Sequence, residues 1–271
     1  MPKVEVGWIG LGIMGLPMAR NLQRKGFLVK VVGHLRREPV ESMKREGAEE
    51  VNSPLELARD CNVIFSMVSN VEKTEEVVFG KDGLLNGLTK DHILVICSTL
   101  APHYCSSLAE RVKRESGAQV IAAPVTGAPW GAESASVTFI VGGDRSVYEK
   151  CMPFFEAMGK NIYHVGDSVE AGLAVKLANN LMAFVNGAAA REAVSLARKA
   201  GVEIPVLFEI VKLSTGDSYI VRNWDILTRL MKEPGMNKTR TKDLEYALDF
   251  ASRIGLDLPL TRLVFDTTRV Q

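Results

Sequence analysis

The sequence predicts an α/β protein in two parts: a doubly wound, mostly parallel sheet followed by an all-helical region. Two observations predict this class. Up to about residue 163, short β-branched runs alternate with helical patterns, which is typical of βαβ units. After that point the pattern is helical and contains no convincing strand. We therefore expect domains at residues 1–163 and 164–271.

The predicted strands of the first part are short apolar runs. They lie at residues 4–9, 27–32, 63–68, 93–97, 119–123 and 136–141. The runs at 63–68 and 93–97 are continuously apolar, as in parallel strands that helices cover on both faces. Helical patterns at 13–25, 38–46, 55–59 and 102–115 alternate with these runs. Ser53 precedes one of these helices and is a good N-cap residue.

The second part begins with an Ala-rich stretch at residues 170–200 that contains no proline. Further helices are expected at 205–212, 224–231 and 242–254. No internal repeat or low-complexity tract interrupts either part.

The composition excludes several classes of protein. Of 271 residues, 46% are hydrophobic and 24% charged, and the formal net charge is +1. This balance argues against nucleic-acid or membrane-surface partners, which select basic faces or tails. No apolar run reaches the length of a membrane span, and the N-terminus does not resemble a signal peptide. We expect a cytoplasmic protein.

The cysteines favour the same compartment. Cys61, Cys97, Cys105 and Cys151 are widely spaced and form no C-x-x-C pair. A disulfide framework or a zinc site is therefore not expected, and the default is a reducing compartment in which these residues serve as small apolar side chains.

The motif Gly10-x-Gly12-x-x-Gly15 follows the first predicted strand and opens a helix. This is the context that a dinucleotide-binding turn requires: glycines permit a tight turn and close approach to pyrophosphate, and the helix N-terminus favours the anion. An ordinary glycine-rich turn is the alternative. The motif predicts a Rossmann-like domain that binds the cofactor through residues Gly10, Leu11, Gly12, Ile13, Met14 and Gly15.

The end of the second strand bears on the choice of cofactor. NAD enzymes usually place Asp or Glu there, about 20 residues beyond the glycines. This chain has Gly33, His34, Leu35, Arg36 and Arg37, and its first carboxylate is Glu38. An imidazole and two guanidiniums suit the 2′-phosphate of NADP, so His34 and Arg36 are predicted to bind it, although a solvated basic loop is the alternative. The sequence favours NADP over NAD.

Gly172, Lys176 and Asn180 follow one stripe of the long predicted helix at i, i+4 and i+8. A lysine among apolar neighbours loses hydration, its pKa falls, and it can exchange a proton at neutral pH. Reduction of a carbonyl by hydride needs such a group, because the oxygen must be protonated. The alternative is a lysine whose charged end reaches solvent. The sequence lacks Y-x-x-x-K and any Cys/His cluster for catalytic zinc, which removes two other dehydrogenase chemistries.

Five motifs in order give the chain a resemblance to the β-hydroxyacid dehydrogenase family, which includes 3-hydroxyisobutyrate dehydrogenases and glyoxylate/succinic semialdehyde reductases. The resemblance covers nearly the whole chain. The motifs are Gly10 to Leu22, Ser98-Thr99-Leu100-Ala101-Pro102, Ala123-Pro124-Val125-Thr126-Gly127 with Gly131, Gly172-x-x-x-Lys176-x-x-x-Asn180, and Lys242-Asp243-Leu244.

The resemblance implies roles for individual residues. Lys176 would be the catalytic lysine with Asn180 beside it at the substrate. Ser98, Thr126 and Gly127 would bind a substrate that carries a carboxylate. Residues lining the cofactor would be Met67, Val68, Ser69, Thr99 and Lys242. It also implies a Rossmann-like domain joined by a long helix to an all-α domain, a site in the cleft between them, and assembly into homodimers or homotetramers.

The chain departs from the family pattern at several positions. Ile96 and Ala122 replace aspartates, and Ala128 replaces a glycine, adding a methyl group where backbone approaches the substrate. NADP-using members commonly have Asn-Arg-Thr after the second strand, where this chain has Gly33-His34-Leu35. The chain also stops at Gln271, earlier than the family pattern, which predicts that the last helices are missing or the C-terminal domain is truncated.

The leading hypothesis is an NADP(H)-dependent reductase of a short aldehyde or keto acid, reversible as a hydroxyacid dehydrogenase, with NAD as the other cofactor. No metal is expected. Two alternatives stay open: a non-catalytic dinucleotide-binding scaffold on the same fold, and an imine reductase. Imine reductases commonly have Asp or Tyr at the position of Lys176, which counts against that alternative.

Overall fold

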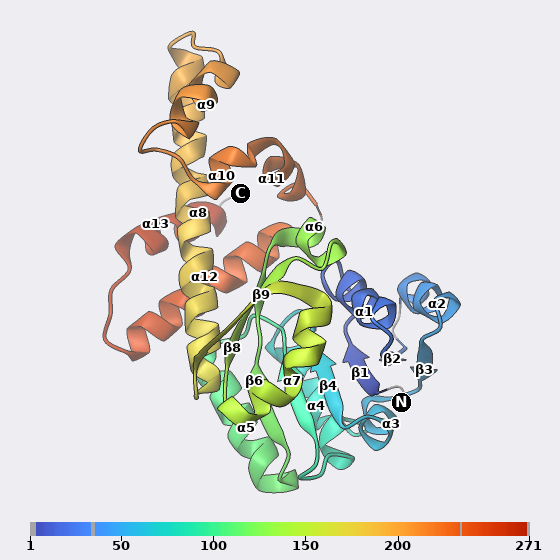
Figure 1. Cartoon of the computed structure of the whole chain (residues 1–271). Helices are drawn as coiled ribbons and strands as arrows, with labels where there is room; N and C mark the ends of the chain where they lie inside the picture. The colour runs from blue at the N-terminus through green and yellow to red at the C-terminus, as the bar shows by residue number, and fades with distance from the viewer. Residues whose placement is uncertain (1–3, 34–35, 234, 270–271) are drawn as a thin grey trace. The chain divides into compact units, whose positions relative to one another are not determined.

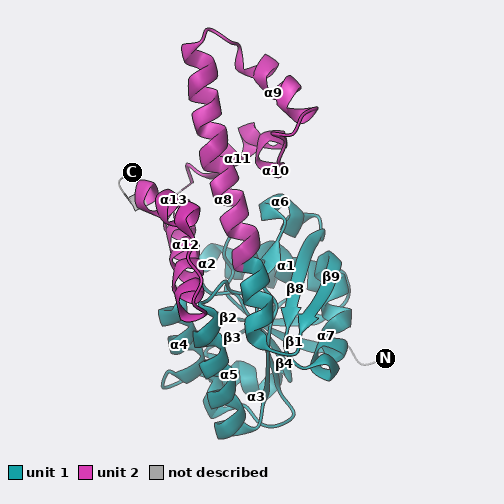
Figure 2. Ribbon diagram, turned by 90° about the vertical axis from the view of Figure 1, so that its left-hand side faces the viewer, with its two compact units in different colours: residues 1–176 teal, residues 177–271 magenta. Residues whose placement is uncertain are grey.

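The computed structural model describes residues 4–33, 36–233 and 235–269, and Figure 1 labels most of its helices and strands. The chain forms two compact units, residues 1–176 and 177–271 (Figure 2). The division falls inside the long helix α8 (Val169–Lys199).

The first unit is built on one nine-stranded sheet. Its strands are β1 (Glu5–Ile9), β2 (Leu28–Val32), β3 (Glu49–Val51), β4 (Val63–Ser66), β5 (Ile93–Ile96), β6 (Gln119–Ala122), β7 (Val125–Thr126), β8 (Val137–Gly142) and β9 (Gly159–Gly166). Strands β3-β2-β1-β4-β5-β6 pair in that order and all in parallel. This is the strand order of dinucleotide-binding folds, and it reverses direction between β1 and β4. Strand β8 then pairs antiparallel with β6 and β7, and β9 pairs parallel with β8.

Helices cover both faces of this sheet. They are α1 (Gly15–Arg24), α2 (Arg37–Arg45), α3 (Pro54–Asp60), α4 (Val71–Phe79), α5 (Pro102–Ser116), α6 (Ala128–Glu133) and α7 (Arg145–Met158), with a 3₁₀ turn at Leu84–Asn86. Successive strand residues point to opposite faces, so Phe65 packs in the core under α1, α2 and α7, whereas Ile64 packs in the core under α3, α4 and α5. The doubly wound prediction is confirmed.

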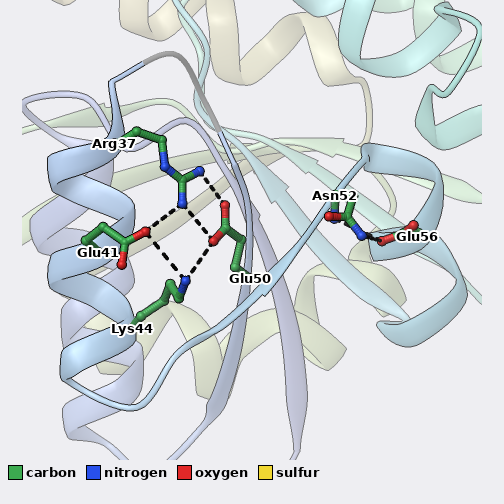
Figure 3. A network of polar contacts seen from close by, with 6 residues as sticks. All are labelled: Arg37, Glu41, Lys44, Glu50, Asn52 and Glu56. Carbon is green, nitrogen blue, oxygen red and sulfur yellow. Dashed lines mark hydrogen bonds and ion pairs between the residues drawn. The ribbon is translucent and has the colours of Figure 1, made fainter.

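Local sequence signals explain where these elements begin. Ser53 caps α3 as predicted, because its hydroxyl accepts a hydrogen bond from the Glu56 N–H at 3.1 Å. The Glu56 carboxylate in turn accepts from both the backbone and the side-chain amide of Asn52, each at 2.9 Å (Figure 3). The two bonds fix how the chain enters the helix.

Strands β3, β7 and β9 are absent from the sequence-based prediction. The first two are only three and two residues long, too short for an alternating pattern to register. Strand β9 has mostly exposed or half-buried residues and is recruited by pairing along β8. The strand pattern therefore continues to Gly166, beyond residue 163.

The described part of the second unit contains helices and no strand. They are the remainder of α8, α9 (Ile204–Lys212), α10 (Tyr219–Arg222), α11 (Trp224–Leu230), α12 (Met236–Arg253) and α13 (Pro259–Arg269). Leu244 and Leu248 of α12 pack with Val264 and Phe265 of α13 and with Phe184 of α8 in a small core. Helix α12 begins at Met236, earlier than the predicted residue 242, and α13 is not anticipated by the sequence.

All four cysteines are buried and free. Burial in apolar surroundings raises the pKa of Cys61, Cys105 and Cys151 to about 12, which keeps these thiols protonated and unreactive. Within the described ranges, no three His, Cys, Asp or Glu side chains gather as metal ligands do. Those ranges also contain no helix with the length and hydropathy needed to cross a membrane.

Candidate active site

The glycine turn after β1 has three glycines in three different situations. Gly10 adopts φ +101°, and a Cβ there would lie 2.3 Å from the Met67 carbonyl oxygen. A Cβ on Gly15 would lie 1.9 Å from the Gly10 carbonyl oxygen, so α1 can approach the strand only without a side chain. A Cβ on Gly12, by contrast, would have no described heavy atom within 4 Å beyond its chain neighbours and the backbone of its own turn. The turn therefore has no room for a side chain at Gly10 or Gly15, whereas the space beside Gly12 is open.

The glycine turn leads into the start of α1, and this helix start suits an anion. Met14, the N-cap of α1, makes no side-chain capping bond in the described structure, and the first turn has no acidic residue. The indole Nε1–H of Trp8 donates to the Gly10 carbonyl at 3.1 Å and stabilises the turn. Free N–H groups and a positive dipole at a helix start attract phosphate. Residues 10–15 therefore fit the pyrophosphate of a dinucleotide.

The predicted cofactor residues after β4 lie at the same edge of the sheet. The Met67 N–H donates to the Ile9 carbonyl at 2.8 Å, so the chain after β4 continues alongside the glycine turn. Val68 and Ser69 follow directly, and Ser69 is exposed. Because β1 and β4 flank the point where the strand order reverses, Met67, Val68 and Ser69 lie where open α/β sheets bind ligands.

The next strand end brings Ser98 and Thr99 to this edge. The Cys97 N–H donates to the Ser66 carbonyl at 2.8 Å, which extends the ladder beyond β5. Ser98 is 4% exposed, and its hydroxyl has no hydrogen-bond partner among the described residues. An unpartnered buried hydroxyl is uncommon, and this one lies one residue before the half-buried Thr99.

The end of β2 differs from the sequence-based argument, which found two guanidiniums and no carboxylate there. Arg37 is held by Glu50 through paired contacts at 2.5 and 2.9 Å and by Glu41 at 2.6 Å (Figure 3). The Glu50 carboxylate lies beside Gly33: a Cβ on Gly33 would lie 2.5 Å from its Oε1 atom. Arg36 is exposed and precedes α2, and His34 lies outside the described residues.

The four charges of this cluster perturb one another. Lys44 donates to Glu50 at 3.0 Å and lies 3.5 Å from Glu41. Hydrogen bonds from Arg37 and then Lys44 lower the pKa of Glu50 to about 2, and the same contacts raise the pKa of Arg37 and of Lys44. Glu50 is therefore ionised throughout the physiological range.

The lowered pKa predicts how Glu50 affects stability with pH. A carboxylate with a depressed folded-state pKa stabilises the fold above its ordinary pKa of 4.5, and this contribution is lost as the pH falls toward about 2. We expect Glu50→Gln to lower the melting temperature at neutral pH by about 2–4 °C and to leave it unchanged near pH 2. Thermal melts of both proteins across this range measure it; a difference independent of pH would contradict the assignment.

The substrate residues predicted around Thr126 lie in an unusual stretch of backbone. Thr126 ends β7, and Gly127 adopts φ +134° with Val137 Cα 3.3 Å from where its Cβ would be. Ala128 then has φ +60°, in the left-handed region that favours glycine. The chain thus turns sharply from β7 into α6 and leaves the Thr126 side chain and the Gly127 backbone half-buried.

Helix α8 packs closely against the sheet through two glycines, Gly172 of α8 and Gly142 of β8. A Cβ on Gly172 would lie 2.8 Å from both the Gly142 nitrogen and the Ile140 oxygen, and one on Gly142 would lie 2.5 Å from the Gly172 nitrogen. Backbone therefore meets backbone, and Leu173 is fully buried in the core beside α5. The contact fixes the start of α8, and Lys176 follows one helical turn after Gly172, half-buried.

Asn180 belongs to a polar chain in the second unit. Its Nδ2 donates to the Asp243 Oδ2 at 2.7 Å, and its Oδ1 accepts from the Asn179 amide at 3.1 Å. Asp243 is 4% exposed, and its Oδ1 lies 3.3 Å from the Lys242 ammonium. The sequence predicts a role for Lys242 and none for Asp243, although both stand in the same motif.

Comparison with protein families identifies both parts of the chain. Residues 5–166 match the NAD binding domain of 6-phosphogluconate dehydrogenase. Residues 170–270 match the NAD-binding family of NADP-dependent 3-hydroxyisobutyrate dehydrogenase.

Curated relatives and solved structures cover nearly the whole chain. A 3-hydroxyisobutyrate dehydrogenase of Pseudomonas aeruginosa is 32% identical over 96% of this chain and 89% of its own length. A 2-hydroxy-3-oxopropionate reductase of Escherichia coli is 33% identical over 95% and 88%. The structure of a 3-hydroxyisobutyrate dehydrogenase of Mycobacterium tuberculosis with L-serine superposes with a TM-score of 0.86 at 25% identity, covering 98% of this chain and 93% of that one.

An imine reductase from Streptomyces aurantiacus shares the fold at 17% identity, with a TM-score of 0.72 over 98% of this chain and 93% of its own. At this identity the likeness concerns the fold alone. The glycine turn, the strand order and the two family matches agree with one another. The chain belongs to the β-hydroxyacid dehydrogenase family and is an NAD(P)-dependent oxidoreductase.

Proposed function

We propose that the chain is an NADP(H)-preferring reductase of short aldehydes or keto acids that carry a carboxylate, reversible as a hydroxyacid dehydrogenase. The observation that carries the proposal is Lys176, one turn beyond the glycine contact that fixes α8 on β8. Named relatives act on such compounds, among them a glyoxylate/succinic semialdehyde reductase of Arabidopsis thaliana, 29% identical.

Lys176 is the general acid of reduction and the general base of oxidation. When bound, the nicotinamide supplies or accepts the hydride. Negative charge gathers on the substrate oxygen as its carbon is reduced, and the Lys176 ammonium donates the proton that neutralises it. The seated start of α8 holds this group in place, which general acid catalysis requires.

Three further residues hold the substrate. The Thr126 hydroxyl and the Gly127 N–H bind its carboxylate, and Ser98, whose buried hydroxyl has no partner in the described structure, is a third donor. Asn180 orients the reacting oxygen. A cluster of neutral donors suits a carboxylate, since each can donate to the anion without a bulky side chain.

NADP is the preferred cofactor. Arg36, exposed at the start of α2 directly after the end of β2, supports binding of a 2′-phosphate. The family description that mentions an NADP-dependent enzyme supports it as well.

Asp243 positions Asn180. Asp243→Asn keeps the shape and removes the charge that accepts from the Asn180 amide. We expect kcat to fall about ten- to a hundredfold, the value of a hydrogen bond to a charged group, with dinucleotide affinity and melting temperature nearly unchanged. Asp249→Asn on the same helix, where a partly exposed carboxylate pairs with Arg253, is the control. Equal losses in both variants, or a collapse of the melting temperature of Asp243→Asn, would contradict a positioning role.

The chain forms a homodimer or homotetramer through its second unit. The support is a set of large exposed apolar side chains that contact with a further copy of the chain would cover: Met182, Leu196, Val206, Ile210, Leu213, Tyr219, Leu260 and Leu263. Four free cysteines support a cytoplasmic location. Light scattering of the purified protein measures the assembly.

The test of the function is oxidation of NADPH and NADH with a panel of glyoxylate, succinic semialdehyde, methylmalonate semialdehyde, 2-hydroxy-3-oxopropionate and sulfonated aldehydes. We expect turnover of at least one of them with NADPH preferred. Imines offered in competition test the imine reductase alternative. Binding of both cofactors with turnover of no compound would favour the scaffold alternative.

A further inference from the structure

The carboxylate of Glu50 lies at a particular distance from the end of β2. A Cβ built on Gly33 would lie 2.5 Å from Glu50 Oε1. Within an aspartate side chain, ordinary bond lengths separate Cβ from each carboxylate oxygen by about 2.4 Å. Glu50, from the neighbouring strand β3, thus places an oxygen as far from this position as an Asp at residue 33 would.

The contacts of Glu50 leave one of its carboxylate oxygens able to accept a further hydrogen bond. Oε2 accepts from both Arg37 and Lys44, at 2.9 and 3.0 Å. Oε1, the oxygen next to Gly33, accepts from Arg37 alone among the described residues, at 2.5 Å. A carboxylate oxygen can accept two hydrogen bonds, so Oε1 retains an acceptor position. The glutamate is also held in place, since its side chain is only 20% exposed.

The charge beside Gly33 is balanced. Arg37 and Lys44 carry two positive charges, and Glu41 and Glu50 carry two negative ones (Figure 3). A 2′-phosphate approaching this position would meet the Glu50 carboxylate as well as Arg37, whose guanidinium is already bound on both of its terminal nitrogens. A neutral 2′-hydroxyl would meet an acceptor and no repulsion.

We propose that Glu50 selects the cofactor: its carboxylate replaces the strand-end acid that Gly33 lacks, accepts from the adenosine 2′-hydroxyl of NAD(H), and opposes the 2′-phosphate of NADP(H). The site therefore takes NAD(H) alongside the NADP(H) that Arg36 favours. This inference rests on the proposed function only in that the chain binds a nicotinamide dinucleotide at residues 10–15.

The test is the affinity for 5′-AMP and for 2′,5′-ADP (adenosine 2′,5′-bisphosphate), which differ only in the 2′-phosphate. Both are titrated calorimetrically against the full chain, and no substrate is needed. In Glu50→Gln, we expect 2′,5′-ADP to bind about tenfold more tightly and 5′-AMP about threefold more weakly, since a like charge and a charged acceptor are both removed. Glu49→Gln is the matched control, because Glu49 precedes Glu50 on β3, is exposed and pairs with Lys30 at 3.4 Å.

A second variant pair keeps the test decisive if Glu50→Gln does not fold. Glu50→Ala should shift the preference toward 2′,5′-ADP, and adding Gly33→Asp should restore it to the wild-type ratio by returning a carboxylate from β2. A wild-type ratio in Glu50→Gln, an equal shift in Glu49→Gln, or no restoration by Gly33→Asp would overturn the proposal.

The outcomes separate this inference from the proposed function. An enzyme that binds both nucleotides with the expected shift but reduces no aldehyde supports Glu50 and contradicts the reductase. A wild-type chain that binds neither nucleotide overturns both.

Discussion

Replacing Lys176 with alanine is expected to lower turnover at least about a thousandfold, within the range that loss of a general acid produces. If Lys176 is the general acid, as we propose, the truncated side chain leaves the developing oxyanion without its proton donor. Binding of NADPH should stay within about threefold of wild type, because we propose that residues 10–15, and not α8, contact the pyrophosphate. Stopped-flow turnover and fluorescence titration of NADPH measure the two effects.

Lys199→Ala in the last turn of the same helix is the control and should retain full turnover. Lys176→Arg keeps a positive charge but holds its proton too tightly to act as an acid near neutral pH, so it should recover little activity. Retained turnover in Lys176→Ala, or equal losses in Lys199→Ala, would contradict the assignment.

The glycine turn gives the second large effect, through a contrast between Gly15→Ala and Gly12→Ala. A methyl group on Gly15 would lie 1.9 Å from the Gly10 carbonyl oxygen, where only backbone movement can relieve the clash. We expect a loss of about 3 kcal/mol or more in the free energy of unfolding, seen as a fall of about 10 °C in melting temperature.

Gly12→Ala should behave in the opposite way. Its methyl group has no described neighbour within 4 Å, so the melting temperature of the free protein should stay near that of wild type. Dinucleotide affinity should fall more than tenfold, because the methyl group occupies the space through which backbone approaches the pyrophosphate. Equal melting temperatures for the two variants, or unchanged affinity in Gly12→Ala, would contradict this description of the turn.

The glycine turn and the first βα unit could be predicted because their signals are local. Strand, glycines and helix are contiguous, and the spacing of Gly10, Gly12 and Gly15 states the backbone requirement directly. The sequence marks Gly172 as part of a motif but does not reveal its contact with Gly142. The two residues are distant in sequence, and they meet because β8 pairs with the sheet.

The carboxylate at the end of β2 could not be predicted, because it too comes from a strand that is distant in sequence. Glu50 reaches Gly33 because β3 pairs in parallel with β2, placing Val32 opposite Val51. No periodicity in the sequence marks β3, so a carboxylate that is distant along the chain looked absent. The sequence likewise does not reveal that Asp243 is the partner of Asn180, because the two residues lie on different helices; the only local signal is that Asp243 adjoins Lys242 in the Lys242-Asp243-Leu244 motif.

The central claim is hydride transfer to a carbonyl carbon assisted by Lys176. The most direct measurement uses NADPH deuterated at the transferring position, with the best substrate of the panel, on wild type and Lys176→Ala. We predict that the wild-type product carries the deuterium on the former carbonyl carbon and that the variant yields almost none. Product without deuterium at that carbon, or equal labelled product from both proteins, would contradict the account.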